Sequence, residues 1–312
     1  MRRSCATVRF ALVAALMLVC TTATACSRGV SPHDSVDGGQ LTSGETTPRS
    51  EDSIRIAYGT SPDNFGRLHL PDGQGPHPVV VMVHGGGWLQ DHDLTYFEPL
   101  ARSLSDAGVA VWNIEYRRVG GTGGWPTTLA DANDATESLA TVVQQSVPGL
   151  LDLNRVHIAG HSAGGHLAAW VAGRHTLSSG APGAEPHIRP RSATIMAGVF
   201  DLSLAATDGH DGFVRQLLDG LPQDHPERYQ MASPVNHLPI GLPVTALHGS
   251  ADQTVDPGQS RSYTDAANGA GDSATLHMLD GVGHGDFGNV NSAAWGVAKQ
   301  TILAHVANDS SQ

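Results

Sequence analysis

Residues 156–165 read VHIAGHSAGG, and they are the part of the sequence that best predicts the fold. Its first four residues are mostly apolar and fit a buried strand, and the segment HLAAWV at 166–171 fits a helix. Between them stands the pattern Gly-x-Ser-x-Gly, centred on Ser162. Its glycines allow a strand-to-helix turn too tight for side chains, and such a turn presents a serine hydroxyl at the start of a helix. We interpret Ser162 as a nucleophile, with a purely structural turn as the alternative.

A second glycine-rich stretch lies upstream of the first. The run PVVVMV at 78–83 lacks polar alternation, as expected for a strand buried on both faces, and HGGGW at 84–88 follows it directly. A hydroxyl that attacks a carbonyl generates an oxyanion, which needs preorganised N–H donors. Glycines let the backbone approach a substrate without obstruction by side chains. We therefore expect the N–H groups of Gly86, Gly87 and Ala163 to form an oxyanion hole, the alternative being a loop that only closes a strand–helix connection.

Strand-like and helix-like segments alternate along the rest of the chain. Strands are expected at 54–58, 65–70, 78–83, 109–114, 155–159, 193–197, 244–247 and 275–279, and helices at 95–107, 127–146, 163–173, 257–269 and 291–307. Such alternation produces βαβ units, so we expect an α/β fold with a mostly parallel central sheet of about eight strands and helices on both faces. Residues 203–241 break the rhythm and are interpreted as a short cap-like insertion.

The N-terminal residues differ in composition from the rest. Arginines precede an apolar run at 10–20, which has about the length of a signal-peptide core and is too short to span a membrane comfortably. Small residues then lead to Cys26, in a pattern that resembles the lipobox of bacterial lipoproteins. We expect residues 1–25 to be a lipoprotein-type signal peptide and Cys26 to be lipidated, with plain cleavage and secretion as the alternative. Residues 26–52 are rich in Ser, Thr, Gly, Pro and Asp and are expected to form a flexible tether, and residues 53–308 the folded domain.

The net charge and the cysteine positions indicate which binding partners and which cellular location to expect. The formal net charge is −12, and the expected signal peptide carries arginines but no acidic residue. A body this acidic is a poor candidate for nucleic-acid binding, which needs a basic surface. All three cysteines lie in the first 26 residues, so the body can form no internal disulfide. We expect an exported protein, held at the outer face of the cell membrane by the lipid on Cys26, or secreted.

The two glycine-rich motifs together resemble the α/β-hydrolase superfamily. The resemblance is to its HGGGW-bearing esterases, namely the hormone-sensitive-lipase, kynurenine-formamidase and acetylxylan/feruloyl-esterase-like groups. It implies the α/β-hydrolase fold and the order serine, acid, histidine along the chain. It covers about residues 76–305, and further matches are NIEYR at 113–117, WP at 125–126 with Asp131, VFDL at 199–202, SP at 233–234 and HGSAD at 248–252.

Two loops downstream of the serine supply candidates for the acid and the base. Asp252 follows an expected strand and matches the family position of the acid. Asp256 could reach the same place, and Asp201 also follows a strand, at a site that some hydrolases use. His284 lies after the last expected strand and matches the family pattern G-x-x-H. Histidine suits the role of base because its ordinary pKa lies near operating pH, although the chain has 17 histidines and a surface loop residue is the plain alternative.

Other features bear on the pocket and on cofactors. Trp88, Trp125 and Phe287 could line an acyl or aromatic pocket, or equally pack against the sheet. No metal is expected, because the chain has no H-E-x-x-H motif and its body has no cysteine pair. The loop GGTGG at 120–124 resembles a dinucleotide-binding loop only superficially, because Pro126 replaces the third glycine that the motif requires. The expected chemistry needs no cofactor.

These features predict a serine hydrolase that cleaves small carboxylic esters through an acyl-enzyme. His284, oriented by Asp252, would take the proton of Ser162, and water would then release the acyl group. Acetyl or feruloyl esters of polysaccharides lead the expected substrates because the protein is expected outside the cell. The alternatives are an arylformamidase-type amide hydrolase, whose usual motif is HGGYW, an exopeptidase, for which no propeller domain is present, and a lipid-anchored binding module that reuses the fold.

Overall fold

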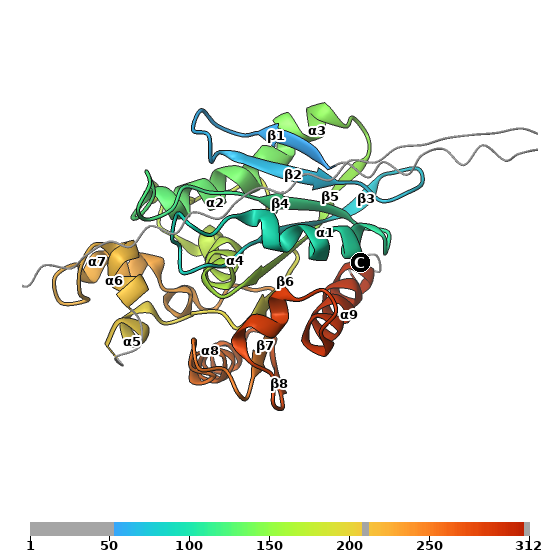
Figure 1. The fold of residues 1–312 in the computed structure, drawn as a ribbon. Coiled ribbons are helices and arrows are strands. Elements are labelled where there is room, and N and C mark those ends of the chain that lie inside the picture. The colour runs from blue at the N-terminus through green and yellow to red at the C-terminus, as the bar shows by residue number, and fades with distance from the viewer. Residues whose placement is uncertain (1–52, 208–211, 309–312) are drawn as a thin grey trace, which may run out of the picture. The chain divides into compact units, whose positions relative to one another are not determined.

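The structure is a computed structural model that describes residues 53–207 and 212–308, so the expected signal peptide, Cys26 and the expected tether lie outside the described residues. The described residues form an eight-stranded sheet with the order β1-β2-β4-β3-β5-β6-β7-β8 (Figure 1). β1 and β2 form an antiparallel hairpin, β2 pairs antiparallel with β4, and every other pair is parallel. The strands are β1 (Ile54–Ala57), β2 (Phe65–His69), β3 (His77–Val83), β4 (Ala110–Ile114), β5 (Leu151–His161), β6 (Ser192–Met196), β7 (Val244–Gly249) and β8 (Ala274–Leu279).

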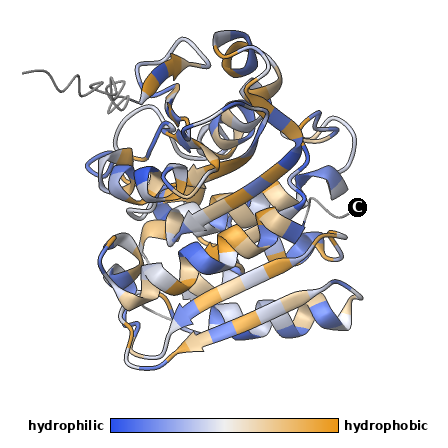
Figure 2. Cartoon of the chain, turned by 90° about the vertical axis from the view of Figure 1, so that its right-hand side faces the viewer, coloured by the Kyte–Doolittle hydropathy of each residue, from blue (hydrophilic) through white to orange (hydrophobic). Residues whose placement is uncertain are grey.

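Helices cover both faces of this sheet. On β3, Val79, Val81 and Val83 face one helical layer, and Val80 and Met82 face the other. The unbroken apolar run of β3 follows from this arrangement, because neither face of the strand meets water. The first layer contains α2 (Thr127–Glu137), α3 (Val142–Ser146), α4 (Ala163–Gly173) and α8 (Gly258–Gly269), and the second contains α1 (Glu98–Ser105) and α9 (Ala293–Asn308). The predicted mostly parallel sheet with helices on both faces is confirmed, and hydrophobic residues recur along its strands and helices (Figure 2).

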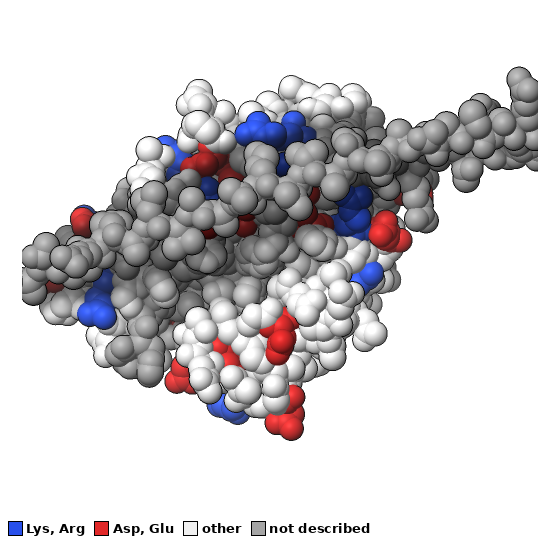
Figure 3. All heavy atoms as spheres, viewed as in Figure 1, with Lys and Arg blue, Asp and Glu red and all other residues white. Residues whose placement is uncertain are grey.

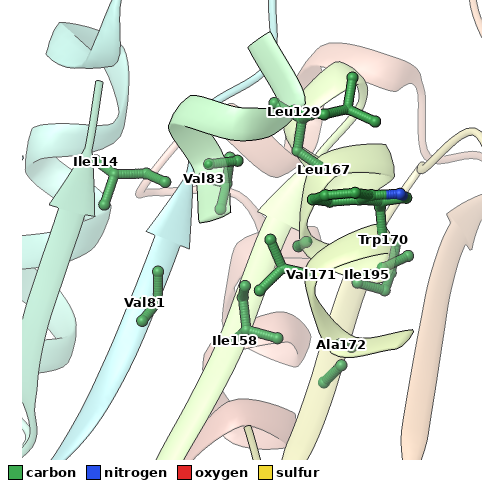
Figure 4. Packing of buried hydrophobic residues seen from close by; sticks show 14 of the residues in the cluster. Val81, Val83, Ile114, Leu129, Ile158, Leu167, Trp170, Val171, Ala172 and Ile195 are labelled. Carbon is green, nitrogen blue, oxygen red and sulfur yellow. The ribbon is translucent and has the colours of Figure 1, made fainter. Parts of the chain in front are cut away.

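The central helix α4 is buried along its whole length. Leu167, Trp170 and Val171 pack toward Ile158 of β5 and Ile195 of β6 (Figure 4). Each large apolar side chain buried in this way stabilises the fold by about 1.5–3 kcal/mol. The packing fixes the N-terminus of α4 relative to the end of β5, and Ser162 lies at that junction.

The prediction of one continuous helix at 127–146 is wrong, because the structure divides this segment into shorter elements. The segment expected as a helix at 127–146 forms α2, a 3-10 turn (Ser138–Ala140) and α3. The hydroxyl of Ser138 donates to the carbonyl of Ala135 at 2.6 Å, and Thr141 departs from helical geometry with φ −124° and ψ −105°. Serine and threonine hydroxyls compete with the backbone for helical carbonyls, so this cluster ends the helix that its apolar pattern alone would continue.

The described residues between β6 and β7 (197–207 and 212–243) contain three short α-helices. They are α5 (Leu202–Thr207), α6 (Gly212–Leu218) and α7 (Pro226–Ala232), and they lie together beside α4 in Figure 1. Buried Val214, Leu217 and Leu218 of α6 join the core that α2 and α4 share. The indole N–H of Trp170 donates to the carbonyl of Met231 at 3.0 Å, which ties α4 to α7. Across the ranges 53–207 and 212–308, no helix combines the length and hydropathy that crossing a membrane requires.

Candidate active site

Ser162 lies at a sharp turn between β5 and α4. Its φ of 56° and ψ of −123° fall outside the regions that non-glycine residues ordinarily adopt. The turn requires glycine on both sides. A Cβ on Gly160 would collide with the carbonyl of Gly164, and a Cβ on Gly164 would collide with the carbonyl of Val83. The strained turn therefore points the Ser162 hydroxyl into the space above the sheet, at the start of a helix.

The structure brings Ser162, His284 and Asp252 together. His284 Nε2 lies 2.9 Å from Ser162 Oγ, and His284 Nδ1 lies 2.8 Å from Asp252 Oδ2. The three residues follow β5, β8 and β7, whose carboxyl ends share one edge of the parallel sheet. The two alternative acids lie elsewhere: Asp256 Oδ1 accepts the N–H of Gly258, and Asp201 Oδ1 accepts the N–H of Leu204.

The carboxylate of Asp252 is saturated with donors. Its Oδ1 accepts the N–H groups of Thr254 at 2.8 Å and Val255 at 3.0 Å, and its Oδ2 lies 3.2 Å from His248 Nε2 as well as against His284. Burial alone raises the pKa of Asp252, but hydrogen bonds from His248, His284 and Val255 outweigh burial and hold the pKa below its ordinary value. An ionised Asp252 can only accept, so His284 Nδ1 carries the proton and Nε2 is left to accept from Ser162.

His248 also contacts Asp252, and no sequence pattern assigns it a role. It lies in the HGSAD segment, four residues before Asp252. Its Nδ1 lies 2.7 Å from Ser260 Oγ, and its Nε2 lies 3.0 Å from the carbonyl of Val255. The ring is fully buried, so these contacts fix its orientation against the carboxylate. The only sequence signal was its place in a matched motif, which does not reveal which way the ring points.

The loop 84–88 begins on a buried charged cluster. His84 Nε2 lies 2.9 Å from Glu115 Oε1, and Arg118 pairs with the same oxygen at 3.0 Å. The hydroxyl of Tyr116 donates to the carbonyl of His84 at 2.8 Å, and the two rings stack with centroids 4.4 Å apart. Each charge in the cluster has a partner, which is the condition under which burying it is tolerable. The start of the loop is therefore held rigidly.

Three N–H groups of this region remain open. Gly86 and Gly87 have φ values of 108° and 61°, in the left-handed region that favours glycine. A Cβ on Gly86 would collide with His92. In the part of the chain that the structure describes, no group accepts a hydrogen bond from the N–H of Gly86, Gly87 or Ala163, and all three residues line one cavity with Ser162. Unpaired N–H groups beside a nucleophile can bind a developing oxyanion.

This cavity has a volume of about 630 Å³ and opens over Ser162 and His284. Trp88 lines it, but Trp125 and Phe287 do not, which corrects the expectation for these two residues. Phe287 is fully buried against the core between the sheet and α9, and Trp125 packs on the core beside α2. Phe213 of α6 was not foreseen as a wall residue, because none of the motifs recognised in the sequence includes it. The other side chains lining the cavity include Leu89, His92, Tyr96, Val199, Gln253, Thr254 and Asn289.

None of the described residues that line the cavity is a Lys or an Arg. On the face drawn in Figure 3, the described Lys and Arg side chains lie in small separate groups beside Asp and Glu. Within residues 53–207 and 212–308, no group of three or more His, Cys, Asp or Glu side chains is placed to hold a metal ion.

A family model described as BD-FAE matches residues 68–266, which is more than half of the chain. Isoprenylcysteine alpha-carbonyl methylesterase ICME of Arabidopsis thaliana is 26% identical over 248 residues, which cover 74% of this chain and 56% of that protein. Esterase LipC of Mycobacterium tuberculosis is 28% identical over 247 residues, which cover 74% of this chain and 59% of that protein. The chain thus spans little more than half the length of these curated relatives.

Solved structures share the architecture at lower sequence identity. A truncated carbohydrate esterase from gut microbiota has a TM-score of 0.68 at 19% identity, covering 81% of this chain and 95% of that one. The butyrate-bound esterase Est2 of Thermogutta terrifontis has a TM-score of 0.67 at 22% identity, covering 84% of this chain and 95% of that one. These likenesses and the strand order confirm the predicted α/β-hydrolase fold.

Proposed function

Because the chain belongs to the BD-FAE family, we propose that it hydrolyses small carboxylic esters through an acyl-enzyme on Ser162. The observation that carries the proposal is the hydrogen-bonded series Asp252–His284–Ser162, which ends in a cavity that also exposes unpaired N–H groups. The names of the relatives ICME and LipC, both esterases, support it.

In the acylation step, Ser162 Oγ attacks the carbonyl carbon of the ester while His284 Nε2 takes its proton. The carbonyl oxygen becomes an oxyanion and accepts hydrogen bonds from Gly86, Gly87 and Ala163. The bond to the alcohol oxygen then breaks, and His284 returns the proton to the departing alcohol. Asp252 stabilises the positive charge that His284 carries in between.

Deacylation uses the same groups in reverse. A water molecule takes the place of the departed alcohol and gives its proton to His284 Nε2 as its oxygen attacks the acyl carbon. The same three N–H groups hold the second oxyanion. The bond to Ser162 Oγ breaks, Ser162 recovers its proton, and the carboxylic acid leaves.

A panel of esters and amides tests this proposal. p-Nitrophenyl acetate, butyrate and octanoate are compared with methyl ferulate, N-formylkynurenine and an aminoacyl p-nitroanilide. We expect saturable hydrolysis of the short esters, with kcat/KM at least tenfold higher than for either amide. Activity confined to N-formylkynurenine or to the anilide would replace the proposal with amide or peptide hydrolysis. Binding of an ester without turnover would favour a binding module.

We further propose that the protein is exported and lipidated on Cys26. The support is the basic, apolar and small-residue pattern that ends at Cys26 in the sequence. Lipid on one cysteine adds apolar groups that favour a membrane or a detergent phase. Triton X-114 partitioning of the full chain from a bacterial host tests this. We expect the full chain in the detergent phase and the Cys26→Ser variant in the aqueous phase; wild-type protein in the aqueous phase would instead indicate simple secretion.

A further inference from the structure

His161, the residue directly before Ser162, is buried and has a partner at each ring nitrogen. Its Nε2 lies 3.0 Å from the backbone carbonyl oxygen of His284, and its Nδ1 lies 3.3 Å from the hydroxyl of Tyr96. A carbonyl oxygen only accepts hydrogen bonds, so His161 Nε2 must carry the proton. Its Nδ1 is then an acceptor, and the Tyr96 hydroxyl must donate to it. Burial lowers the pKa of His161 to about 3, which keeps the ring neutral and in this one tautomer.

The hydroxyl of Tyr96 continues the series in the other direction. Tyr96 lies in the 3-10 turn η1 (Leu94–Phe97), and its oxygen accepts the N–H of Gly85 at 2.6 Å. Burial raises the pKa of Tyr96, so the hydroxyl keeps the proton that it donates to His161. The hydrogen bonds therefore run in one direction, from Gly85 to Tyr96, from Tyr96 to His161, and from His161 to the backbone of His284. The Tyr96 hydroxyl both accepts and donates, and each ring nitrogen of His161 makes one hydrogen bond.

Packing reinforces this connection. A Cβ added to Gly288 would lie 3.2 Å from the Tyr96 ring, so the tyrosine lies directly against the turn η5 (His284–Gly288). The rings of His161 and His284 have centroids 4.7 Å apart. Tyr96 thus contacts both the loop that carries Gly86 and the turn that begins with His284.

The strand order explains why the turn that carries His284 needs these contacts. β8, which leads to His284, lies at the edge of the sheet, and β6 and β7 separate it from β5, which leads to Ser162. The turn that carries His284 therefore reaches back across two strands to meet the serine. A base displaced by a fraction of an ångström loses alignment with the nucleophile, and a displacement of about 1 Å can lower a rate by about a hundredfold.

We propose that Tyr96 and His161 are positioning residues that lock the backbone of His284 to the Gly85–Gly87 loop through a single hydrogen-bonded relay. The relay sets the distance between the base and the oxyanion hole, the two parts that must act on the same carbonyl group. This inference rests on the proposed esterase function. Neither side chain takes part in bond making, and their effect passes through His284 and the loop.

Three variants test the relay in the full-length protein with p-nitrophenyl butyrate. Tyr96→Phe keeps the ring against Gly288 and removes only the hydroxyl. His161→Phe fills the same space among aromatic rings without a donor. We expect each single variant to lower kcat by about ten- to a hundredfold with little change in KM. Because both changes break one relay, the double variant is expected to lose no more than the worse single variant.

Two further measurements separate positioning from folding. The Ki of a trifluoromethyl ketone, which forms a tetrahedral adduct on the serine, is expected to rise by the factor by which kcat/KM falls. Tyr229→Phe is the matched control, because it removes the hydroxyl of another buried tyrosine that donates to a backbone carbonyl, that of Gly220 at 2.8 Å. We expect this control to leave kcat within about twofold of wild type, since its hydroxyl bonds within the insertion.

The outcomes are distinct. Wild-type protein without ester hydrolysis overturns the proposed function itself. An active wild type with a Tyr96→Phe kcat within twofold overturns the relay alone. Losses that multiply in the double variant show two independent effects and also overturn the relay. A loss that vanishes after correction for the folded fraction, measured by circular dichroism at the assay temperature, does the same.

Discussion

His248 and His284 both approach one oxygen of the same carboxylate, Oδ2 of Asp252, at 3.2 Å and 2.8 Å. The two rings play different parts. The ring of His284 reaches the cavity, whereas that of His248 is fully buried and bonded to Ser260. The buried ring helps to keep Asp252 ionised, and the ionised carboxylate fixes which nitrogen of His284 carries a proton.

Asp252→Asn tests this assignment of the acid. An asparagine can turn its amide N–H₂ toward His284 Nδ1, which selects the tautomer that cannot accept a proton from Ser162. We expect kcat to fall by about 10³–10⁴-fold, with folding intact. Asp256→Asn and Asp201→Asn are matched controls, because their carboxylates cap local turns, and each is expected to retain kcat within about threefold. A larger loss in either control than in Asp252→Asn would reassign the acid. Steady-state kinetics on a short ester provides the measurement.

Gly87→Ala tests the oxyanion loop. The residue has φ 61°, and an added Cβ would approach the ring of Phe213 at 3.2 Å. The positive φ is strained for alanine and the Phe213 ring crowds the added Cβ, so we expect the loop to shift, an N–H donor to move and kcat to fall by about 10²-fold. Gly149→Ala carries comparable backbone strain at φ 77° in open space, and it is expected to lower stability by about 1 kcal/mol without changing kcat. Equal kcat losses in the two variants would indicate general strain instead of a lost donor.

Phe213→Ala tests the wall that the insertion contributes. Phe213 lines the cavity beside Gly87, and its removal adds room for apolar groups of the substrate. Each additional buried methylene contributes about 0.8 kcal/mol, so we expect the ratio of kcat/KM for octanoate over acetate to rise several-fold. Leu204→Ala removes an exposed apolar side chain from neighbouring α5 that does not line the cavity. An unchanged ratio in Phe213→Ala, or an equal rise in Leu204→Ala, would exclude Phe213 as a specificity residue.

Buried histidines predict how stability depends on pH. Burial lowers the pKa of His157 well below its ordinary value, that of His161 to about 3 and that of His166 to about 4. Their contribution to stability is complete above the unfolded-state pKa of about 6.5 and is lost as the pH falls toward the folded-state values, because only the unfolded chain then binds the protons. We expect the free energy of unfolding to fall from about pH 6.5 to about pH 4, each histidine contributing at most about 1.4 kcal/mol per pH unit.

Urea unfolding at pH values across this range provides the measurement. His161→Phe is expected to reduce the slope by the share of one histidine, since its replacement does not titrate. A free energy of unfolding that stays constant between about pH 6.5 and pH 4 would contradict the prediction.

The sequence predicted those parts of the site that local chemistry dictates. The turn at Ser162 needs glycines at fixed offsets, so the ten residues 156–165 are enough to predict it. Asp252 and His284 each follow a strand that is predicted from its own apolar run. The eight strands were predictable for the same reason. The structure places His284 within hydrogen-bonding distance of both Ser162 and Asp252, and the catalytic roles of these three residues stay predictions.

The parts that the sequence did not predict depend on tertiary packing. Phe287 follows His284 closely, but the 3-10 turn between them directs the phenyl ring into the core and not into the cavity. Tyr96 contacts Gly85 and also His161, which lies 65 residues further along the chain. The role of His248 depends on the direction in which its ring points. No local sequence pattern reveals either feature. Phe213 lies in the insertion, where no motif indicates which side chain faces the cavity.

The proposed function depends on Ser162 being a nucleophile that His284 activates. A fluorophosphonate probe, followed by peptide mass spectrometry, detects this activation, because the probe forms a covalent bond only with an activated serine. We predict one equivalent of label on Ser162 in wild-type protein, no label in Ser162→Ala, and labelling slowed by at least about a hundredfold in His284→Ala. Intact folded protein that stays unlabelled, or a Ser162→Ala variant that labels as well as wild type, would show that Ser162 is not the nucleophile.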